Sequence, residues 1–124
     1  MPGLWSECGS KQEPERWDAR TRTLLGEAAL QRLREARVLV AGVGGVGGYA
    51  AEMLARSGVG HLTLIDADEV AVSNLNRQLI ATIPDIGRPK VNLFAERFRS
   101  INPEISVKAL QAYIKPEDVE YLLG

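Results

Sequence analysis

The amino-acid sequence predicts an α/β fold: a Rossmann-like βαβαβ half of a mostly parallel, doubly wound sheet, preceded by one or two helices. Three observations support this prediction. An apolar run, Val38–Ala41, leads directly into the glycine turn Gly42–Gly47. A helical pattern follows the turn, and a second apolar run, His61–Ile65, comes after the helix. The order strand, glycine turn, helix, strand is typical of a parallel βαβ unit.

The composition is that of one small globular domain. The chain has 124 residues, of which 45% are hydrophobic and 25% charged, and both values are ordinary for a folded domain. A formal net charge of -1 gives no overall attraction to nucleic acid or to acidic membranes, so a contact with RNA would need a local basic face. The charge therefore neither supports nor excludes RNA binding.

The first residues predict a tail and not part of the fold. Residues 1–15 combine glycines and charges with too little apolar surface to pack, so we expect a flexible N-terminal tail. Its one cysteine, Cys8, cannot form an internal disulfide, and we expect an exposed thiol. There is no secretory signal pattern and no run near the roughly 18 apolar residues of a membrane-spanning helix, so we expect a cytoplasmic protein.

The segment ahead of the sheet has a helical pattern. Apolar residues recur at helical spacing over residues 20–36, which predicts one helix or two short ones. The run Val38–Ala41 contains no charge and ends at glycine. It predicts a central parallel strand that is buried on both faces.

The helix after the glycine turn should bury one apolar face. We expect this face to carry the apolar residues spaced at i, i+4, i+7 and i+8, namely Val46, Ala50, Met53 and Leu54. Gly58 and Gly60 follow and are suited to left-handed backbone geometry at the helix end.

A second helix and a third strand complete the pattern. Pro89 fits the first turn of a helix that Asn102–Pro103 ends. We expect its buried face to consist of Val91, Phe94, Ala95, Phe98 and Ile101. Residues 105–110 alternate as in a strand, and residues 116–123 begin a further helix. Because a doubly wound sheet normally continues with a second half, we expect residues 16–124 to be the incomplete N-terminal part of a larger domain.

The glycine turn and Asp66 together indicate a nucleotide site. Glycines let the backbone approach phosphate oxygens, and the helix that follows directs free N–H groups toward them. A tight turn without a ligand would use the same glycines, so the turn alone is a weak indicator. Asp66 lies at the end of the second strand, where a carboxylate can accept the ribose hydroxyls of NAD or ATP. For Asp68 we favour a turn-capping role instead.

Two cations favour a triphosphate over a dinucleotide. Arg77 can grip phosphate oxygens with its planar guanidinium, and Lys90 supplies a mobile point charge. Asn74 and Gln78 could orient the phosphates or the attacking group through neutral hydrogen bonds. Each of these residues alone would fit an ordinary solvated surface position. Their joint placement after Asp66 argues for a shared site.

Several segments of the sequence resemble the ubiquitin-activating superfamily that includes ThiF and MoeB. The segments are Gly42–Gly47, Leu64–Asp68, Ser73–Gln78, Gly87–Lys90 and Ile101–Pro103. The resemblance runs from about Arg16 to the end of the sequence. Within the superfamily the chain is most similar to the tRNA threonylcarbamoyladenosine dehydratases, the TcdA family, through Gly44–Glu52, Arg56–Gly60 and Asn76.

The resemblance implies a role for each candidate site residue. The phosphates of ATP would be lined by Gly42, Gly44, Gly45 and Gly47, and the ribose would be held by Asp66. The triphosphate would be engaged by Asn74, Arg77, Gln78 and Lys90. Arg20 matches an arginine that in relatives reaches across a homodimer to the ATP of the neighbouring subunit. Arg77, Lys90 and Arg20 would then be the catalytic cations.

The resemblance also implies an activity, the ATP-dependent adenylation of a carboxylate. The preferred substrate is threonylcarbamoyladenosine in tRNA, which would be dehydrated and cyclised. One alternative is an adenylyltransferase that activates the C-terminus of a ubiquitin-like sulfur carrier, with sulfur-relay proteins as partners. An alternative of another class is an NAD-binding oxidoreductase or a non-catalytic Rossmann module. The family's Mg²⁺-binding aspartate, and any catalytic or zinc-binding cysteines, would fall beyond Gly124. We therefore expect no metal ligand in this sequence and no activity from the 124 residues alone.

Overall fold

The computed structural model describes residues 16–123. The predicted tail, residues 1–15, and Cys8 lie outside this range. Within it, no helix combines the length and the apolar character that crossing a membrane requires.

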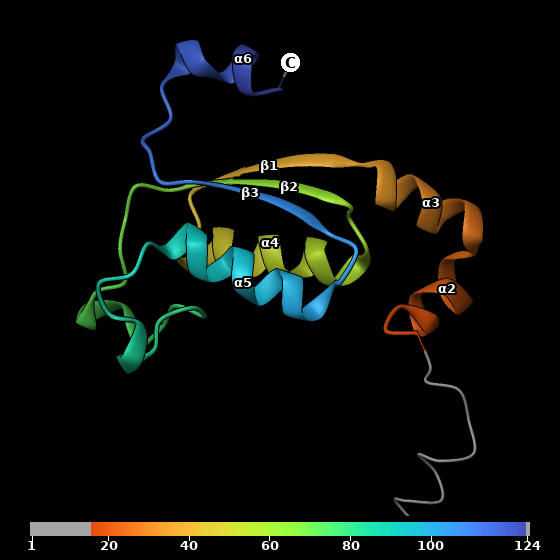
Figure 1. The fold of residues 1–124 in the computed structure, drawn as a ribbon, viewed down its shortest axis with the longest axis horizontal. Coiled ribbons are helices and arrows are strands. Elements are labelled where there is room, and N and C mark those ends of the chain that lie inside the picture. Colours follow the sequence, from red (N-terminus) through yellow and green to blue (C-terminus); the bar gives the residue numbers. More distant parts are fainter. Residues whose placement is uncertain (1–15, 124) are drawn as a thin grey trace, which may run out of the picture.

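Three parallel strands form the sheet, and their order along the sheet is their order along the chain (Figure 1). The strands are β1 (Arg37–Ala41), β2 (His61–Ile65) and β3 (Ser106–Leu110). Both neighbouring pairs are parallel and in register over their whole length. All three strands therefore end at one edge of the sheet, which we call the carboxyl end, and begin at the opposite, amino end. The predicted α/β class is confirmed.

Two helices cover one face of the sheet, as Figure 1 shows. They are α4 (Gly45–Ser57) and α5 (Lys90–Ile101). The predicted buried face of α5 is confirmed, because Val91, Phe94 and Phe98 are almost completely buried. The rings of Phe94 and Phe98 lie 5.3 Å apart. These side chains form the centre of the core with the inward residues of β2.

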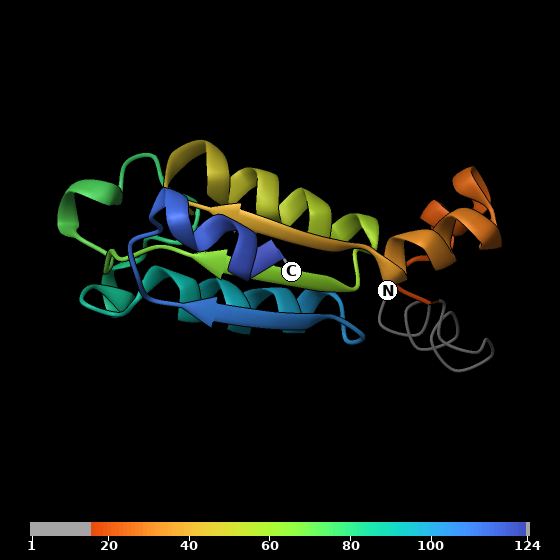
Figure 2. The same cartoon turned by 90° about the horizontal axis from the view of Figure 1, so that it is seen from above.

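The segment ahead of the sheet forms two short helices, which together we call the N-terminal arm. They are α2 (Ala19–Leu25) and α3 (Glu27–Glu35), and Gly26 separates them with a positive φ of 84°. The arm extends from the amino end of the sheet (Figure 2). Leu30 anchors α3 in the fold with 1% exposure, whereas α2 has no buried residue.

The remaining elements are short. The single turns η1 (Val72–Asn74) and η2 (Ile83–Asp85) lie in the connection from β2 to α5. After β3, η3 (Pro116–Asp118) leads into α6 (Val119–Leu123), which confirms the predicted helix start. Figure 1 places α6 on the side of the sheet opposite to α4 and α5.

The predicted buried face of α4 is wrong for Val46, Ala50 and Met53, which are exposed, whereas Leu54 packs against the core as predicted. The helix buries Gly48, Ala51 and Ala55, whereas Val46 and Met53 are 86% and 62% exposed. A Cβ atom at Gly48 would lie only 2.7 Å from the Phe94 ring. Because α4 and α5 pack this closely, small residues occupy the contact, while Val46 and Met53 face outward.

The position and burial of β1 fit the first strand of an incomplete doubly wound sheet. β1 lies at one edge of the described sheet, with half-buried residues in its middle and exposed residues at both ends. β2 occupies the central position and has the more buried pattern. An uncharged strand sequence indicates burial of the strand faces and leaves the position of the strand in the sheet open.

The two glycines near the end of α4, Gly58 and Gly60, have different structural roles. Gly58 ends the helix in the left-handed conformation, as predicted, with a φ of 107°. Gly60 has no positive φ. A Cβ atom there would lie 1.8 Å from the carbonyl oxygen of Arg34, so the absence of a side chain lets the arm approach β2.

Candidate nucleotide site

The glycine turn lies at the carboxyl end of β1 and begins α4. Gly42 has a φ of 89°, and its N–H donates to the carbonyl of Ile65 at 2.7 Å. A Cβ atom at Gly47 would lie 1.8 Å from the carbonyl oxygen of Gly42, so the turn folds tightly onto the helix. No side chain caps the helix at Gly44. The first N–H groups of α4 therefore remain available to an anionic ligand.

Asp66 braces this turn. Its Oδ2 accepts the N–H of Val43 at 2.8 Å, and its Oδ1 accepts the N–H of Asp68 at 2.8 Å. The sequence did not reveal this structural use of the carboxylate. Each oxygen can accept more than one hydrogen bond, so the contacts leave capacity for the predicted ribose hydroxyls.

Gln78 comes to the same turn from a different segment. Its Nε2 lies 3.4 Å from the position that a Cβ atom of Gly44 would occupy. Its Oε1 is buried without a hydrogen-bond partner among the described residues. A buried acceptor without a donor is costly, so this amide is suited to meeting a donor from outside the described residues.

Lys90 is tied to the turn through two aspartates. It is the first residue of α5 and only 3% exposed, and its Nζ lies 3.9 Å from Oδ2 of Asp68. The backbone N–H of Lys90 donates to the Asp68 carbonyl, and the N–H of Asp68 donates to the Asp66 carboxylate. This series of contacts joins the start of α5 to the glycine turn.

Asn74 and Arg77 instead contact their own turn. Asn74 is 8% exposed, and its Oδ1 accepts the N–H of Ala71 at 2.8 Å. Arg77 is exposed, and its Nη1 donates to the carbonyl of Ser73 at 2.8 Å and to Oδ1 of Asn76 at 3.1 Å. The structure therefore places both residues in the segment that carries Gln78, but it does not bring the Arg77 guanidinium to the glycine turn.

Arg20 lies at the other end of the molecule. It is an exposed residue of α2, and the arm extends from the amino end of the sheet (Figure 2). The structure does not bring it to the glycine turn of its own chain. Any contact of Arg20 with a nucleotide at that turn would require a second copy of the chain.

The cations of the carboxyl end differ in how they are paired. Arg88 lies 3.1 Å from Asp85 and 2.8 Å from Glu96, and these two contacts raise the pKa of Arg88. Among residues 16–123, Arg77 contacts only neutral acceptors, and Lys90 has one carboxylate at 3.9 Å. Arg77 and Lys90 are therefore the better placed to exchange a partner for a phosphate.

The described residues offer no evident metal centre. No group of three histidine, cysteine, aspartate or glutamate side chains in residues 16–123 is arranged to hold a metal ion. Asp66 and Asp68 alone do not supply the set of oxygen ligands that Mg²⁺ requires, so the described residues do not fit this ion.

The family profile and the individual relatives agree with each other. The sequence profile of the ThiF family matches residues 18–124. The chain is 48% identical over 99 residues to a tRNA threonylcarbamoyladenosine dehydratase of Escherichia coli (strain K12), which covers 80% of this chain and 37% of the relative. It is 44% identical over 97 residues to the sulfur carrier protein ThiS adenylyltransferase of the same strain, covering 76% and 39%. The chain thus spans about two fifths of the length of these relatives.

Solved structures agree with the sequence comparison. The crystal structure of E. coli tRNA N6-threonylcarbamoyladenosine dehydratase, TcdA, matches with a TM-score of 0.82 and 44% identity, over 86% of this chain and 45% of the other. The structure of TcdA in complex with ATP matches with a TM-score of 0.80 and 45% identity, over 84% and 43%.

Proposed function

The chain belongs to the ThiF family, and on that premise we propose that it supplies the ATP-binding part of an enzyme that adenylates a carboxylate. The observation that carries the proposal is the convergence of separate segments on one glycine turn. The Asp66 carboxylate, the Gln78 amide and the start of α5 with Lys90 are all tied to that turn. TcdA, a relative of known structure, has been solved with ATP.

Within this proposal each candidate residue has a defined task. The glycines of the turn, Gly42, Gly44, Gly45 and Gly47, line the phosphates, and Asp66 holds the ribose. Gln78 and Asn74 orient the phosphates through their amides. Arg77 releases its own turn to reach the triphosphate, and Lys90 moves from Asp68 to a phosphate oxygen. Arg20 of a second copy approaches the same triphosphate in a homodimer.

The chemistry follows from these tasks. A carboxylate oxygen attacks the α-phosphorus of ATP, the bond to the bridging oxygen breaks, and pyrophosphate leaves with that electron pair. Once in place, Arg77, Lys90 and Arg20 offset the negative charge that develops on the phosphate oxygens, the electrostatic stabilisation on which phosphoryl chemistry mainly depends. The product is an acyl adenylate with a reactive carbonyl carbon.

We propose the threonyl carboxylate of threonylcarbamoyladenosine in tRNA as the acceptor. A neighbouring nitrogen attacks the adenylated carbonyl, AMP leaves, and a proton is lost. The net result is a ring formed with the loss of water. The 48% identity to a dehydratase of this substrate supports the choice. A tRNA substrate also favours the cytoplasm as the compartment.

A sulfur-carrier adenylyltransferase remains the second candidate. The 44% identity to the ThiS adenylyltransferase favours it specifically. Its ATP site and first step would be the same, and it differs in the acceptor, which would be the C-terminal carboxylate of a small protein delivered by sulfur-relay partners.

Mg²⁺ would accompany ATP in either reaction. Because residues 16–123 do not form a fitting set of ligands, we assign no step to the metal and expect its ligand in residues outside the described range. Any activity is therefore to be measured in the full-length protein that carries this chain.

The test is pyrophosphate release by that full-length protein. We expect release with ATP and threonylcarbamoylated tRNA, and none when unmodified tRNA is supplied. Release with a sulfur carrier and not with the tRNA would select the second candidate. Tight binding of NAD without binding of ATP would reject adenylation and support an oxidoreductase or a non-catalytic module.

A further inference from the structure

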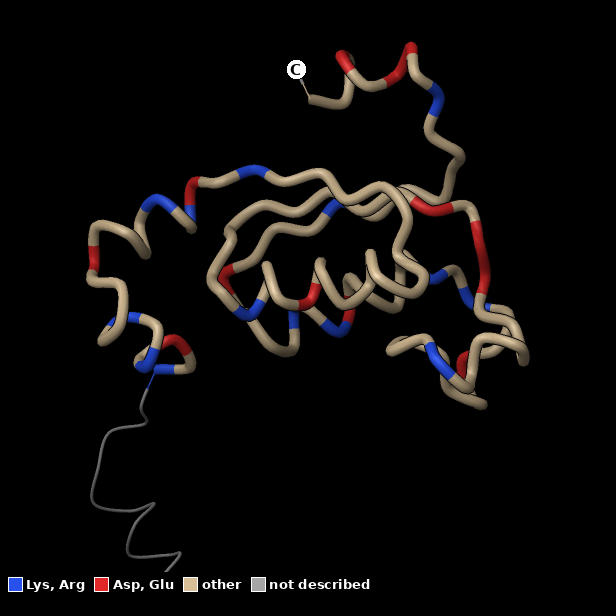
Figure 3. Tube along the Cα trace, turned by 180° about the vertical axis from the view of Figure 1, so that it is seen from behind, with Lys and Arg blue, Asp and Glu red and all other residues tan. Residues whose placement is uncertain are grey.

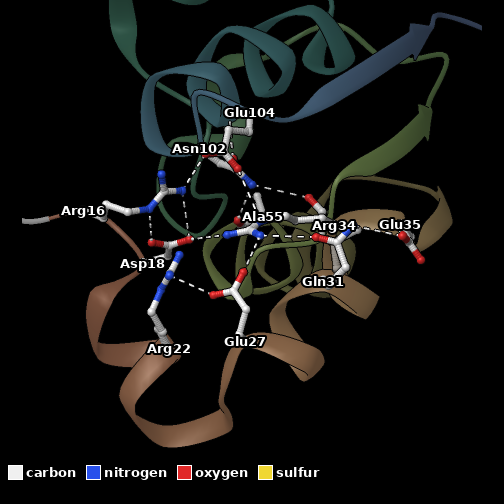
Figure 4. Close-up of polar contacts among 11 residues, drawn as sticks. Arg16, Asp18, Arg22, Glu27, Gln31, Arg34, Glu35, Ala55, Asn102 and Glu104 are labelled. Atoms are coloured by element: carbon white, nitrogen blue, oxygen red, sulfur yellow. Dashed lines mark hydrogen bonds and ion pairs between the residues drawn. The ribbon is translucent and has the colours of Figure 1, made fainter.

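The N-terminal arm is joined to the rest of the molecule by a closed ring of charged side chains. We call this ring the charged clamp, and it consists of Arg16, Asp18, Arg34 and Glu104 (Figure 4). The Asp18 carboxylate lies 3.1 Å from Nε of Arg16 and 3.5 Å from Nη2 of Arg34. The Glu104 carboxylate lies 2.6 Å from Nη2 of Arg16 and 3.5 Å from Nε of Arg34. Each acid thus contacts both arginines.

The clamp joins the two helices of the arm to a residue that is distant in sequence. Asp18 is the residue that precedes α2, Arg34 lies in α3, and Glu104 lies between α5 and β3. Glu104 is itself held, because its N–H donates to Oδ1 of Asn102 at 3.1 Å. Asn102 is buried, and its Nδ2 donates to the carbonyl of Ala55 at the end of α4. The clamp therefore connects α2 to the rigid core.

Apolar packing does little to place α2. No residue of α2 is buried, and Leu24 is 82% exposed. A cavity of about 170 Å³ remains between the arm and the start of β2, lined in part by Trp17 and Gly60. The carboxylate of Asp18, by contrast, is 3% exposed. With so little packing, polar contacts place α2: those of Asp18, and the ion pair of Arg22 with Glu27 at 2.8 Å.

We propose that the charged clamp positions Arg20, because it fixes the direction in which α2 presents this arginine to the ATP of a second copy of the chain. Arg20 lies two residues after Asp18, within the first turn of α2. A change in the tilt of α2 would thus move its guanidinium directly. This inference rests on the proposed role of Arg20 in adenylation, and it makes Asp18 and Glu104 positioning residues.

Hydrogen exchange of the chain itself tests the first half of the proposal. Asp18→Asn and Glu104→Gln each remove one acid of the clamp with almost no change of shape. We expect amide exchange in α2 to rise about tenfold, while exchange in β2 and α5 stays unchanged. The matched control is Glu35→Gln, because Glu35 accepts a hydrogen bond from Gln31 in the same arm without touching the clamp. Unchanged amide exchange in α2 would overturn the proposal that the charged clamp holds this helix in place.

A double-mutant cycle in the full-length protein tests the second half. We expect Arg20→Ala to lower kcat for pyrophosphate release about 100-fold, and Asp18→Asn to lower it about tenfold with a smaller change in KM for ATP. If Asp18 acts only through Arg20, Asp18→Asn causes no further loss in the Arg20→Ala background. A full additional tenfold loss there would show a general structural effect and overturn the inference.

The two proposals can fail separately. If Arg20→Ala leaves kcat unchanged, the positioning inference is overturned while pyrophosphate release still supports adenylation. If the full-length protein releases no pyrophosphate with either acceptor, adenylation itself is rejected.

Discussion

The two ends of the sheet are built on different principles. At the carboxyl end, the backbone forms the structure: Asp66 accepts two N–H groups, and the glycine turn folds against α4. At the amino end, charged side chains neutralise one another, and the Arg16 guanidinium holds the pKa of Asp18 below its usual range. Figure 3 shows Lys and Arg interspersed with Asp and Glu along the arm. The contrast indicates that charge at the amino end holds the arm in place, while at the carboxyl end Arg77 and Lys90 are the cations best placed to meet a ligand.

The largest expected effects come from a matched pair of glycines, one at each end. In Gly47→Ala and Gly60→Ala the new Cβ would lie 1.8 Å from a backbone oxygen, that of Gly42 or that of Arg34. We expect each change to lower the free energy of unfolding by about 3 kcal/mol, because backbone must move in both. Urea unfolding of the chain measures this loss.

The same pair separates the ends functionally. Folded Gly60→Ala protein should still bind ATP in the full-length context, whereas Gly47→Ala protein should not. Equal loss of ATP binding in both variants would mean that the two ends are not independent, and the comparison would fail.

A smaller effect is expected from Lys90→Met. The side chain is 4% exposed, and methionine can fill its space while the charge is lost. We expect the Kd for ATP in the full-length protein to rise about 10- to 100-fold, with the free energy of unfolding unchanged or higher. Titration calorimetry measures the affinity. Lys108→Met on β3 is the control, because Lys108 is exposed and lies outside the site. An unchanged Kd would remove Lys90 from the triphosphate role.

Gly45→Ala should separate folding from binding within the turn. A Cβ at this first residue of α4 meets no atom within 4 Å, so the helix should gain about 0.5–1 kcal/mol from the change. The methyl group would nevertheless stand where a phosphate approaches the backbone, and we expect the Kd for ATP to rise about tenfold. Higher stability together with unaltered affinity would show that no phosphate comes close to Gly45.

The smallest effect is expected when the pH is lowered and the carboxylate of Asp18, at the amino end, becomes protonated. Because the pKa of folded Asp18 is lowered by Arg16, its contribution to stability is present above its unfolded pKa. The contribution is lost as the pH falls through the folded pKa, which the Arg16 guanidinium holds below the ordinary range of an aspartate. The stability difference between the chain and Asp18→Asn, measured by urea unfolding, should thus be larger at pH 7 than at pH 3. A constant difference would contradict the role of the ion pairs.

Local patterns predicted the elements well because they depend on neighbouring residues. The third strand and the apolar face of α5 follow from alternation and from helical spacing. The buried face of α4 could not be predicted in this way, because the close approach of Phe94 from a distant helix selects Gly48 over Met53. The buried face of α4 is set by its tertiary contact with α5, which the spacing of residues within α4 does not encode.

The candidate site likewise has parts that the sequence predicts and parts that it does not. The glycine turn and Asp66 could be identified from their spacing, but the N–H of Val43 as a partner of Asp66 could not, because backbone donors leave no trace in the sequence. Asn102 was recognised only as the end of a helix, yet it links Ala55 to Glu104. In the sequence, the available signal for such a link is an asparagine that follows a helix and precedes a proline.

The double hydrogen bonding of Asp66 has a consequence for the thermodynamics of nucleotide capture. With Val43 and Asp68 as donors, the carboxylate has a single orientation before any ligand arrives. A ribose that meets it would therefore cost the protein little rotational entropy at this residue. The ordering cost of binding would then fall mainly on the nucleotide and on Arg77, whose long side chain must leave Ser73 to reach a phosphate.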